Sequence, residues 1–326
     1  METRRIGSLA VSVVGLGCNN FGGRLDAERT ARVVAAAIDA GVTFFDTADR
    51  YGETRSEEYL GRALGPRRSS VVLATKFGSK IDESRQGARP EYVRQALEDS
   101  LRRLGTDWVD LYQLHRPDPL VPIAERLGAL NDLVVEGKVR EIGCSNFTAD
   151  QLREAGRALR HGAAGFVSVQ NEYSLLHRDP EHGVLSECSA QGLALLPYFP
   201  LASGLLTGKY KRGQDAPEGT RLADPQGRFA SRFLNDAKLA AAEHLAEFAS
   251  SRGRTLLGLA LSWLLTRPEV SSVIPGATSP EQVRANVEAT AWKLTEEERR
   301  AVDILTRDGL PRPTPGSREH PERARP

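Results

Sequence analysis

The sequence predicts an α/β protein whose strands and helices close into a (β/α)8 TIM barrel. Short β-branched runs alternate with longer amphipathic segments, the strand segments are apolar throughout, and eight such units fit into the 326 residues. Strands that alternate with helices are typical of parallel pairing, and continuously apolar strands are typical of a sheet buried on both faces. Eight units in a chain of this length favour a closed barrel over an open, doubly wound sheet.

The expected units follow one another along the chain. Their strands and helices are SVVGLG with 26–40, VTFFD with 55–64, SSVVLATK with 90–104, WVDLYQLH with 120–136, VREIGCS with 148–160, GFVSVQ with 180–191, LALLPY with 235–251 and 254–266, and VSSVIPG with 279–291. Three of the helix starts, at 54–57, 148–151 and 279–282, have the spacing of a capping box.

The segment before the first unit resembles the start of a secretory signal, because two arginines precede an apolar stretch. Its apolar residues, however, alternate with serine and alanine, and Gly7 with Ser8 offers a turn. This pattern favours a β-hairpin that leads into the first barrel strand.

Residues 1–310 are expected to form a single domain, with additional helices near the C-terminus. The stretch 204–234 has glycines, basic residues and weak apolar periodicity, which predicts a long loop over one face of the barrel. The tail 311–326 is rich in proline and charge, so we expect it to be disordered.

The composition is that of an ordinary globular protein, with 40% hydrophobic and 27% charged residues and a net charge of +1. This balance argues against partners such as nucleic acid or an anionic membrane, and no apolar run approaches the roughly 20 residues that span a bilayer. Cys18, Cys144 and Cys188 lack a metal or redox spacing. A reduced, cytoplasmic setting follows.

The run VVGLGCNNFGG, residues 13–23, resembles the beginning of a phosphate-binding loop. Gly15 and Gly17 fit the dinucleotide fingerprint, but its third glycine is replaced by Asn20, and the next helix begins only near Asp26. A tight turn after a strand explains this run better, so any nucleotide must be held by other residues.

A carboxylate, a phenol, an ammonium and an imidazole are expected on one rim of the barrel. Asp46, Lys76 and His115 end the second, third and fourth strands, and Tyr51 follows Asp46 by five residues. Chemistry in such barrels sits at the carboxyl ends of the strands. A lysine cation lowers the pKa of a neighbouring phenol, a carboxylate positions the lysine, and a histidine orients a carbonyl or relays a proton. The set suits proton transfer to a carbonyl oxygen.

Each of these residues also has a structural interpretation. Asp46 could cap a turn, Lys76 could be a surface charge, and His115 could be a hydrogen-bonded core histidine. Their common position on successive strand ends favours the functional interpretation.

The sequence resembles the aldo-keto reductase family from about residue 4 to 307. The matching segments are FFDTADRYG, LATKFG, DLYQLHRPD, GKVREIGCSNF, VQNEYSLL, YFPLASGLLTGKY and VIPGATSPEQVRANVEA. The resemblance implies a barrel that binds a nicotinamide dinucleotide without a Rossmann loop, with Tyr51 as general acid and Asp46, Lys76 and His115 completing the catalytic tetrad.

The resemblance also implies a set of cofactor-binding residues. Gly17, Cys18, Asn19 and Asp46 would border the nicotinamide and the substrate mouth, Ser145, Asn146 and Gln170 the carboxamide, and Tyr198 the nicotinamide ring. Pro200, Leu201, Ser203, Gly204, Leu205 and Lys209 would cross the pyrophosphate, and Gly276, Thr278, Gln282 and Asn286 would hold the adenosine end. Gln282 could instead serve only the capping box. Phe199, Cys18 and Ala285 depart from the residues usual in relatives, and none of the three belongs to the tetrad.

The leading interpretation is a reductase of aldehydes, ketones or sugars that uses NADP(H) in preference to NAD(H). Relatives whose last strand end is similarly uncharged use the phosphorylated cofactor, and Lys209 and Arg221 could supply positive charge. The alternative is a cofactor-binding regulatory subunit that resembles potassium-channel β subunits.

No metal site is expected, because no His-x-His follows the first strand and His177 with His182 has no ligand-like context. Arg50, beside Tyr51, could either favour an anionic substrate or be a plain surface charge. No oligomeric state is indicated.

Overall fold

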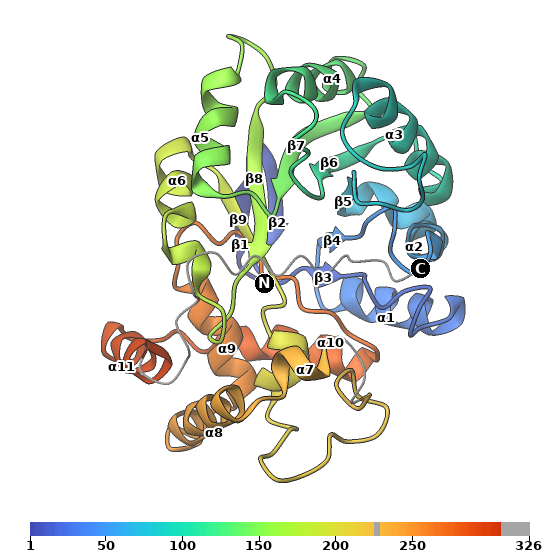
Figure 1. Cartoon of the computed structure of the whole chain (residues 1–326). Helices are drawn as coiled ribbons and strands as arrows, with labels where there is room; N and C mark the ends of the chain where they lie inside the picture. The colour runs from blue at the N-terminus through green and yellow to red at the C-terminus, as the bar shows by residue number, and fades with distance from the viewer. Residues whose placement is uncertain (225–228, 308–326) are drawn as a thin grey trace.

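The computed structural model describes residues 1–224 and 229–307, and seven consecutive parallel strands form its main sheet (Figure 1). Each strand pairs with the next one along the chain, as a barrel requires. The strands are β3 (Leu16–Gly17), β4 (Phe44–Asp46), β5 (Val72–Phe77), β6 (Val109–Leu114), β7 (Val139–Ser145), β8 (Phe166–Glu172) and β9 (Ala194–Tyr198).

The eighth expected strand closes the barrel through isolated bridges. Val273 pairs with Val14 and Gly276 with Gly17 on one side, and Val270 pairs with Leu195 on the other, all in parallel. A Cβ atom on Gly17 would lie 2.8 Å from the carbonyl oxygen of Ile274, so this close approach requires glycine. The (β/α)8 prediction is confirmed.

Helices surround the barrel and continue into a C-terminal group (Figure 1). The outer ring contains α1 (Ala27–Asp39), α2 (Arg55–Leu64), α3 (Pro90–Leu104), α4 (Ile123–Val135), α5 (Ala149–Ala158) and α6 (Val184–Gln191). After β9 come α7 (Ala230–Phe233), α8 (Asp236–Ser250), α9 (Leu256–Leu265), α10 (Pro280–Glu288) and α11 (Glu296–Arg307). Short 3-10 turns occupy η1 (Gly65–Ser70), η2 (Asp179–Glu181), η3 (Ala202–Thr207) and η4 (Ala289–Ala291).

The three predicted capping boxes have different outcomes. The box of Thr148 and Gln151 is complete and begins α5. At α10 the Ser279 side chain accepts from the Gln282 backbone N–H, but the Gln282 side chain accepts from the Thr278 N–H, so only half of the box forms. At α2 the prediction is wrong. Thr54 has a left-handed φ of 74° and its side chain caps nothing, because it ends a left-handed turn.

The predicted N-terminal hairpin is present and covers the amino ends of the barrel strands. It consists of β1 (Thr3–Ile6) and β2 (Leu9–Ser12), which pair in antiparallel fashion. Its apolar side chains pack against the first residues of several strands, Phe44 and Ala194 among them. Arg4 donates to the carbonyl oxygens of Val270 at 2.6 Å and Leu265 at 2.9 Å, which ties the hairpin to the chain before the eighth strand.

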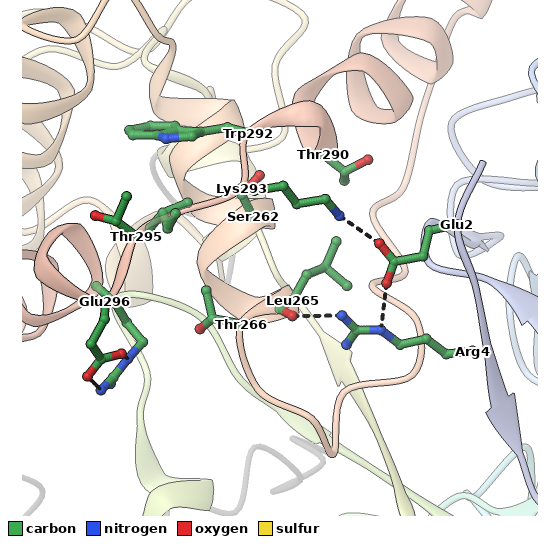
Figure 2. A pocket seen from close by; sticks show the side chains of 12 residues that line it. Glu2, Arg4, Ser262, Leu265, Thr266, Thr290, Trp292, Lys293, Thr295 and Glu296 are labelled. Atoms are coloured by element: carbon green, nitrogen blue, oxygen red, sulfur yellow. Dashed lines mark hydrogen bonds and ion pairs between the residues drawn. The ribbon is translucent and has the colours of Figure 1, made fainter.

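A cavity of about 480 Å³ lies beside this hairpin (Figure 2). The hairpin contributes Glu2 and Arg4, and the chain around α9 and η4 contributes residues such as Trp292 and Lys293. Glu2 is paired with Arg4 at 3.2 Å and with Lys293 at 2.6 Å. The cavity is therefore at the amino end of the barrel, away from the strand ends that carry the tetrad.

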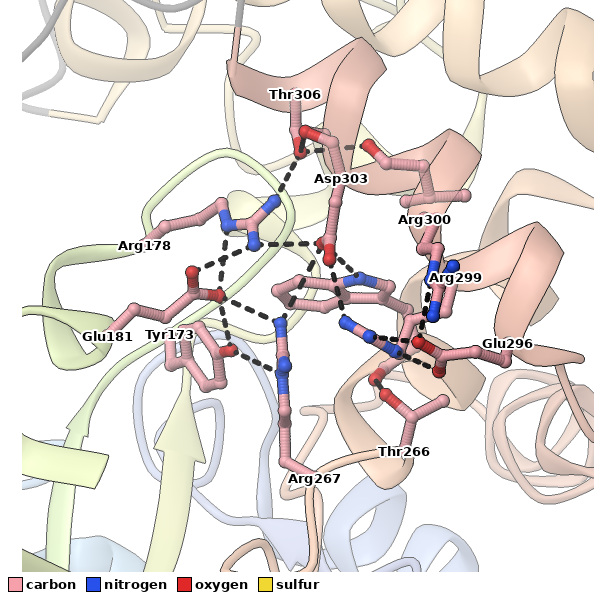
Figure 3. A network of polar contacts seen from close by, with 12 residues as sticks. Tyr173, Arg178, Glu181, Thr266, Arg267, Glu296, Arg299, Arg300, Asp303 and Thr306 are labelled. Carbon is pink, nitrogen blue, oxygen red and sulfur yellow. Dashed lines mark hydrogen bonds and ion pairs between the residues drawn. The ribbon is translucent and has the colours of Figure 1, made fainter. Parts of the chain in front are cut away.

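A polar network joins α11 to the barrel (Figure 3). Asp303 of α11 accepts from Arg178 and Arg299 at 2.8 Å each and from the Trp263 indole at 3.2 Å. The Arg178 guanidinium lies 4.8 Å from the centroid of the Trp263 ring, and Arg267 lies at 5.2 Å. Asp303 thus supplies a buried negative charge to a group of arginines.

The two segments expected outside the repeat are described in part. In 204–234 the beginning forms η3 and the end forms α7, with no regular helix or strand in 208–224. The expected disordered tail 311–326 lies outside the described residues. Within the described ranges, no helix is both long and apolar enough to cross a bilayer.

Candidate active site

Asp46 and Lys76 form a buried ion pair where β4 and β5 end. The Lys76 Nζ lies 2.6 Å from Asp46 Oδ2 and donates to the Thr47 carbonyl oxygen at 2.7 Å. Both side chains are almost completely shielded from solvent. Because a buried charge is costly without a partner, each of the two groups needs the other at this position.

Tyr51 and His115 lie over this pair. Their ring centroids are 5.7 Å apart with the planes at 83°, and the Lys76 Nζ is 5.1 Å from the Tyr51 ring centroid. His115 directly follows β6, and its backbone N–H donates to the Phe77 carbonyl oxygen of β5 at 2.8 Å. The four residues predicted on one rim are therefore brought together.

The surroundings determine the protonation of the four groups. Loss of solvation raises the pKa of Tyr51, and although Lys76 lowers it as expected from the sequence, the net pKa is above its usual 10. Loss of solvation lowers the pKa of Lys76, but Asp46 and Tyr51 outweigh it and the net pKa is raised. The pKa of His115 is held well below 6.5 by loss of solvation, followed by the charges of Lys76, Arg50 and Arg116. At neutral pH the site contains a protonated phenol, an ammonium and a neutral imidazole.

The second oxygen of Asp46 is held by two amides that point into the barrel. Gln113 donates to Asp46 Oδ1 at 3.1 Å and Gln170 at 2.9 Å. Gln170 was expected beside the cofactor, whereas Gln113 was missed. The signal was an amide side chain two positions before His115 in the strand WVDLYQLH.

Asn146 connects the tetrad to the neighbouring strand ends. Its backbone is left-handed, with φ of 62°, and its Nδ2 donates to the His115 carbonyl oxygen at 2.9 Å and to Ser145 Oγ at 3.0 Å. Tyr198 donates through its hydroxyl to Asn146 Oδ1 at 2.8 Å. Ser145 donates to the Gln170 carbonyl oxygen at 2.7 Å. These four residues, all expected at the cofactor, lie together beside the tetrad.

The segment after β9 has an unusual backbone. Phe199, Ala202 and Ser203 all have positive φ, between 46° and 57°. Non-glycine residues rarely adopt this region, and such strain is concentrated at functional sites. The Ser203 hydroxyl is buried and meets no hydrogen-bond partner in the described part of the chain. The same segment contains four other residues that were predicted to cross the pyrophosphate of the cofactor. They are Pro200, Leu201, Gly204 and Leu205.

Three cations gather where this segment approaches the first strand. Lys209 is half-buried, and loss of solvation together with the charges of Arg24 and Arg221 lowers its pKa. Arg24 donates to the Gly219 carbonyl oxygen at 2.5 Å. Arg221 donates to Asn20 Oδ1 at 2.5 Å and to Asn19 Oδ1 at 3.2 Å. Arg24 was missed by the sequence reasoning, because one arginine after two glycines carries no pattern.

The remaining predicted residues flank the junction of the first and eighth strands. A Cβ atom on Gly276 would lie 3.1 Å from Asn20 Nδ2 and 3.5 Å from Asn19 Oδ1. The two asparagine side chains therefore approach the backbone of Gly276 closely and leave little space for a side chain there. Cys18 is buried and donates its N–H to the Asp46 carbonyl oxygen at 2.9 Å. Thr278 and Gln282 bond each other at the start of α10, and Asn286 is buried within that helix.

These features fit a dinucleotide. A half-buried lysine whose pKa is lowered by loss of solvation and by two neighbouring arginines, with a buried Ser203 hydroxyl that meets no partner in the described residues, suits the phosphate oxygens of a bound anion. Among residues 1–224 and 229–307, no three His, Cys, Asp or Glu side chains are grouped so as to hold a metal ion. The three described cysteines are all free and buried.

The sequence model of the Aldo/keto reductase family matches residues 13–307. The chain belongs to the aldo/keto reductase family. Members of the family are oxidoreductases that act on carbonyl substrates with nicotinamide cofactors, and this chain shares that general activity.

Relatives of the chain carry names from two groups within the family. The aldo-keto reductase YhdN of Bacillus subtilis (strain 168) is 33% identical over 314 residues, which cover 94% of this chain and 93% of that protein. A probable voltage-gated potassium channel subunit beta of Oryza sativa subsp. japonica is 39% identical over 279 residues, which cover 82% and 84% of the two chains. The solved structure of the glycerol dehydrogenase AKR11B4 from Gluconobacter oxydans is similar with a TM-score of 0.80, at 31% identity and coverage of 96% and 97%.

Proposed function

We propose that this aldo/keto reductase reduces the carbonyl group of small aldehydes, ketones or sugars with NADPH, and that Tyr51 donates the proton. The observation that carries the proposal is the position of the protonated Tyr51 phenol, whose ring centroid lies 5.1 Å from Lys76 Nζ of the buried Lys76–Asp46 ion pair and 5.7 Å from the neutral imidazole of His115.

In the proposed reaction each member of the tetrad has one task. The neutral imidazole of His115 orients the carbonyl oxygen toward Tyr51. The Tyr51 hydroxyl then protonates that oxygen, and the ammonium of Lys76 stabilises the phenolate that forms. Asp46 holds the ammonium in place and is itself fixed by Gln113 and Gln170.

When bound, the nicotinamide cofactor would supply the hydride. Tyr198 would support one face of its ring, and Ser145, Asn146 and Gln170 would hold its carboxamide. The crossing segment around Ser203, with Lys209, Arg24 and Arg221, would hold the phosphates. Gly276, Thr278, Gln282 and Asn286 would border the adenosine end. Holding both reactants in one barrel mouth removes much of the entropy cost of their encounter.

The preference for NADPH over NADH rests on positive charge. A 2′-phosphate needs a cation or several donors beside it, and Arg24, Lys209 and Arg221 are the charges that this part of the site offers. Titration of both reduced cofactors by fluorescence, at fixed salt, tests this point. Tighter binding of NADPH supports the preference, whereas tighter binding of NADH would reverse it and leave the reductase assignment intact.

Steady-state assays of a panel of aldehydes, ketones and sugars with each cofactor test the activity itself. Oxidation of the reduced cofactor that depends on the carbonyl compound supports the proposal. Absence of turnover across the panel, in protein that binds the cofactor, would contradict it.

The second candidate is a cofactor-binding regulatory subunit, which the 39% identity to the rice channel-subunit relative favours. A stable membrane-protein partner in a pull-down, together with negligible turnover of simple aldehydes, would support this second function.

We further propose that residues 1–310 form a single domain. We also propose a cytoplasmic location, in line with the free, buried cysteines.

A further inference from the structure

Phe199 contacts three other aromatic side chains just after β9 ends. Its ring centroid lies 5.3 Å from that of Tyr198, 5.7 Å from that of Phe229 and 5.9 Å from that of Phe233. The ring planes in these pairs cross at 77° to 83°, which is the edge-to-face arrangement that aromatic pairs favour. All three pairs share Phe199, so this ring connects the end of β9 to the region of α7.

The backbone of Phe199 is unfavourable for so large a side chain. Its φ of 50° lies in the left-handed region, which bulky residues rarely adopt. The residue also begins the crossing segment, because its carbonyl oxygen accepts the N–H of Ala202 at 2.8 Å. A strained residue persists only where the surrounding structure holds it, and such residues are concentrated at functional sites. The ring contacts of Phe199 therefore stabilise the turn at which the crossing segment starts.

One of these contacts leads to the nicotinamide end of the proposed cofactor site. Tyr198 would support the nicotinamide ring, and its hydroxyl donates to Asn146 Oδ1 at 2.8 Å. Tyr198 is thus held at its hydroxyl by Asn146 and along its ring by Phe199. The contact with Phe199 helps to fix the plane against which the nicotinamide would stack.

A second contact leads to a cation proposed for the cofactor phosphates. The Arg221 guanidinium lies 5.7 Å from the centroid of the Phe229 ring, and an aromatic face attracts a cation at this distance. The same guanidinium donates to Asn20 Oδ1 at 2.5 Å, in the loop after β3. Phe229 therefore supports Arg221, and Phe199 supports Phe229.

An ion pair attaches α7 to the neighbouring strand. Arg232 of α7 pairs with Glu172, the last residue of β8. Glu172 lies opposite Tyr198 in the parallel register of β8 and β9. The region of α7 is thus attached at the ends of two adjacent strands, beside the residues proposed for the cofactor.

We propose that Phe199 is a positioning residue of the cofactor site. Through its ring contacts it holds Tyr198 in place for the nicotinamide and, by way of Phe229, Arg221 in place for a phosphate. The inference rests on the proposed function, which assigns Tyr198 and Arg221 to the cofactor. It gives a role to one of the residues in which this chain departs from its relatives.

Cofactor affinity in the absence of substrate tests this role. We measure the Kd of NADPH and of NADH by fluorescence titration, and the unfolding of the cofactor-free protein in urea. Phe199→Leu keeps an apolar side chain without the ring, and we expect it to raise the Kd about tenfold, the order of magnitude for the loss of one or two aromatic pairs. Phe199→Tyr keeps the ring, so its Kd should stay within about twofold of the wild-type value.

Phe166→Leu is the matched control. Phe166, the first residue of β8, makes the same kind of contact with Phe147, with ring centroids 5.6 Å apart and planes at 79°. Its loss should lower stability in urea and leave the Kd unchanged. Phe229→Leu tests the second step, because it should raise the Kd by itself and make the effect of Phe199→Leu smaller in the double variant.

The outcomes separate this inference from the function on which it rests. A wild-type Kd in Phe199→Leu would overturn the positioning role whatever the change in stability, and an equal rise in Phe166→Leu would do the same. If Phe199→Leu does not fold, a wild-type Kd in Phe229→Leu overturns it instead. A wild-type protein that binds neither NADPH nor NADH would overturn the proposed function and this inference together.

Discussion

At the scale of the residue, Lys76 controls the protonation of Tyr51. The sequence predicted a lowered phenol pKa, but the buried position of the ring raises it further than Lys76 lowers it. Sequence reasoning could not weigh these two effects, because the extent of burial depends on loops that pack over the barrel mouth. That these four side chains lie together was predictable, since each member is at or just after a recognisable strand end.

Lys76→Met is expected to lower kcat and to move the basic limb of the pH profile upward. Removal of the ammonium takes away the charge that lowers the Tyr51 pKa, so the phenol keeps its proton to higher pH. The measurement is kcat/KM against pH with NADPH and a simple aldehyde. Lys138→Met, which removes a surface lysine paired with Glu98, is the control. A basic limb that stays in place in a still-active Lys76→Met variant would contradict the role given to Lys76.

Asp49, two residues before Tyr51, is a buried acid outside the proposed chemistry. Neither of its carboxylate oxygens has a hydrogen-bond partner among the described residues. Loss of solvation, reinforced by Glu57, raises its pKa from 3.8 to about 8. Between these two values the folded protein keeps a proton that the unfolded chain has released. Stability should therefore decrease as pH rises from about 4 to 8, by at most about 1.4 kcal/mol per pH unit from this group.

Asp49→Asn removes this titration. We expect the variant to gain stability relative to the wild type as pH rises from 5 to 8, and the difference to level off above 8. Urea unfolding of both proteins across this pH range measures the effect. Parallel stability curves for the two proteins would contradict the assignment.

At the scale of the element, Asp303 and Thr306 are the α11 side chains that bond Arg178. Asp303 neutralises Arg178 and Arg299 and accepts from the Trp263 indole, with an exposed side-chain fraction of 10%. Asp303→Ala should lower the free energy of unfolding by about 1–3 kcal/mol, because the buried Trp263 indole loses its acceptor and Arg178 and Arg299 are left with Glu181 and Glu296 as their carboxylate partners. Glu297→Ala, at an exposed position of the same helix, is the control and should change little. Equal stability of the two variants in urea unfolding would contradict this account.

The helices themselves were largely predictable, and their ends were less so. The capping box at Thr148 was read correctly, because the side chains of Thr148 and Gln151 each accept from the other residue's backbone N–H. Thr54 has the same spacing, but the left-handed turn that precedes it takes its hydroxyl out of reach. Spacing alone contains no information on that backbone conformation.

At the scale of the whole molecule, the alternation of strands and helices was enough to predict the barrel, and the alternation of apolar residues with serine and alanine around Gly7 and Ser8 predicted its hairpin. The contacts that close the site join residues far apart in sequence, such as Arg221 with Asn20 and Gln170 with Asp46. Gln113 and Arg24 escaped prediction for this reason, since their roles arise only when distant strand ends meet.

The most direct test of the account is the Tyr51→Phe variant, which removes the proposed proton donor and keeps its ring. We measure kcat/KM for a simple aldehyde with NADPH, and NADPH affinity by fluorescence titration. The account predicts a loss of activity on the order of 10²–10⁴-fold, as is usual for removal of a general acid, with nearly unchanged cofactor affinity. Turnover at the wild-type rate by a Tyr51→Phe variant that binds NADPH would contradict it.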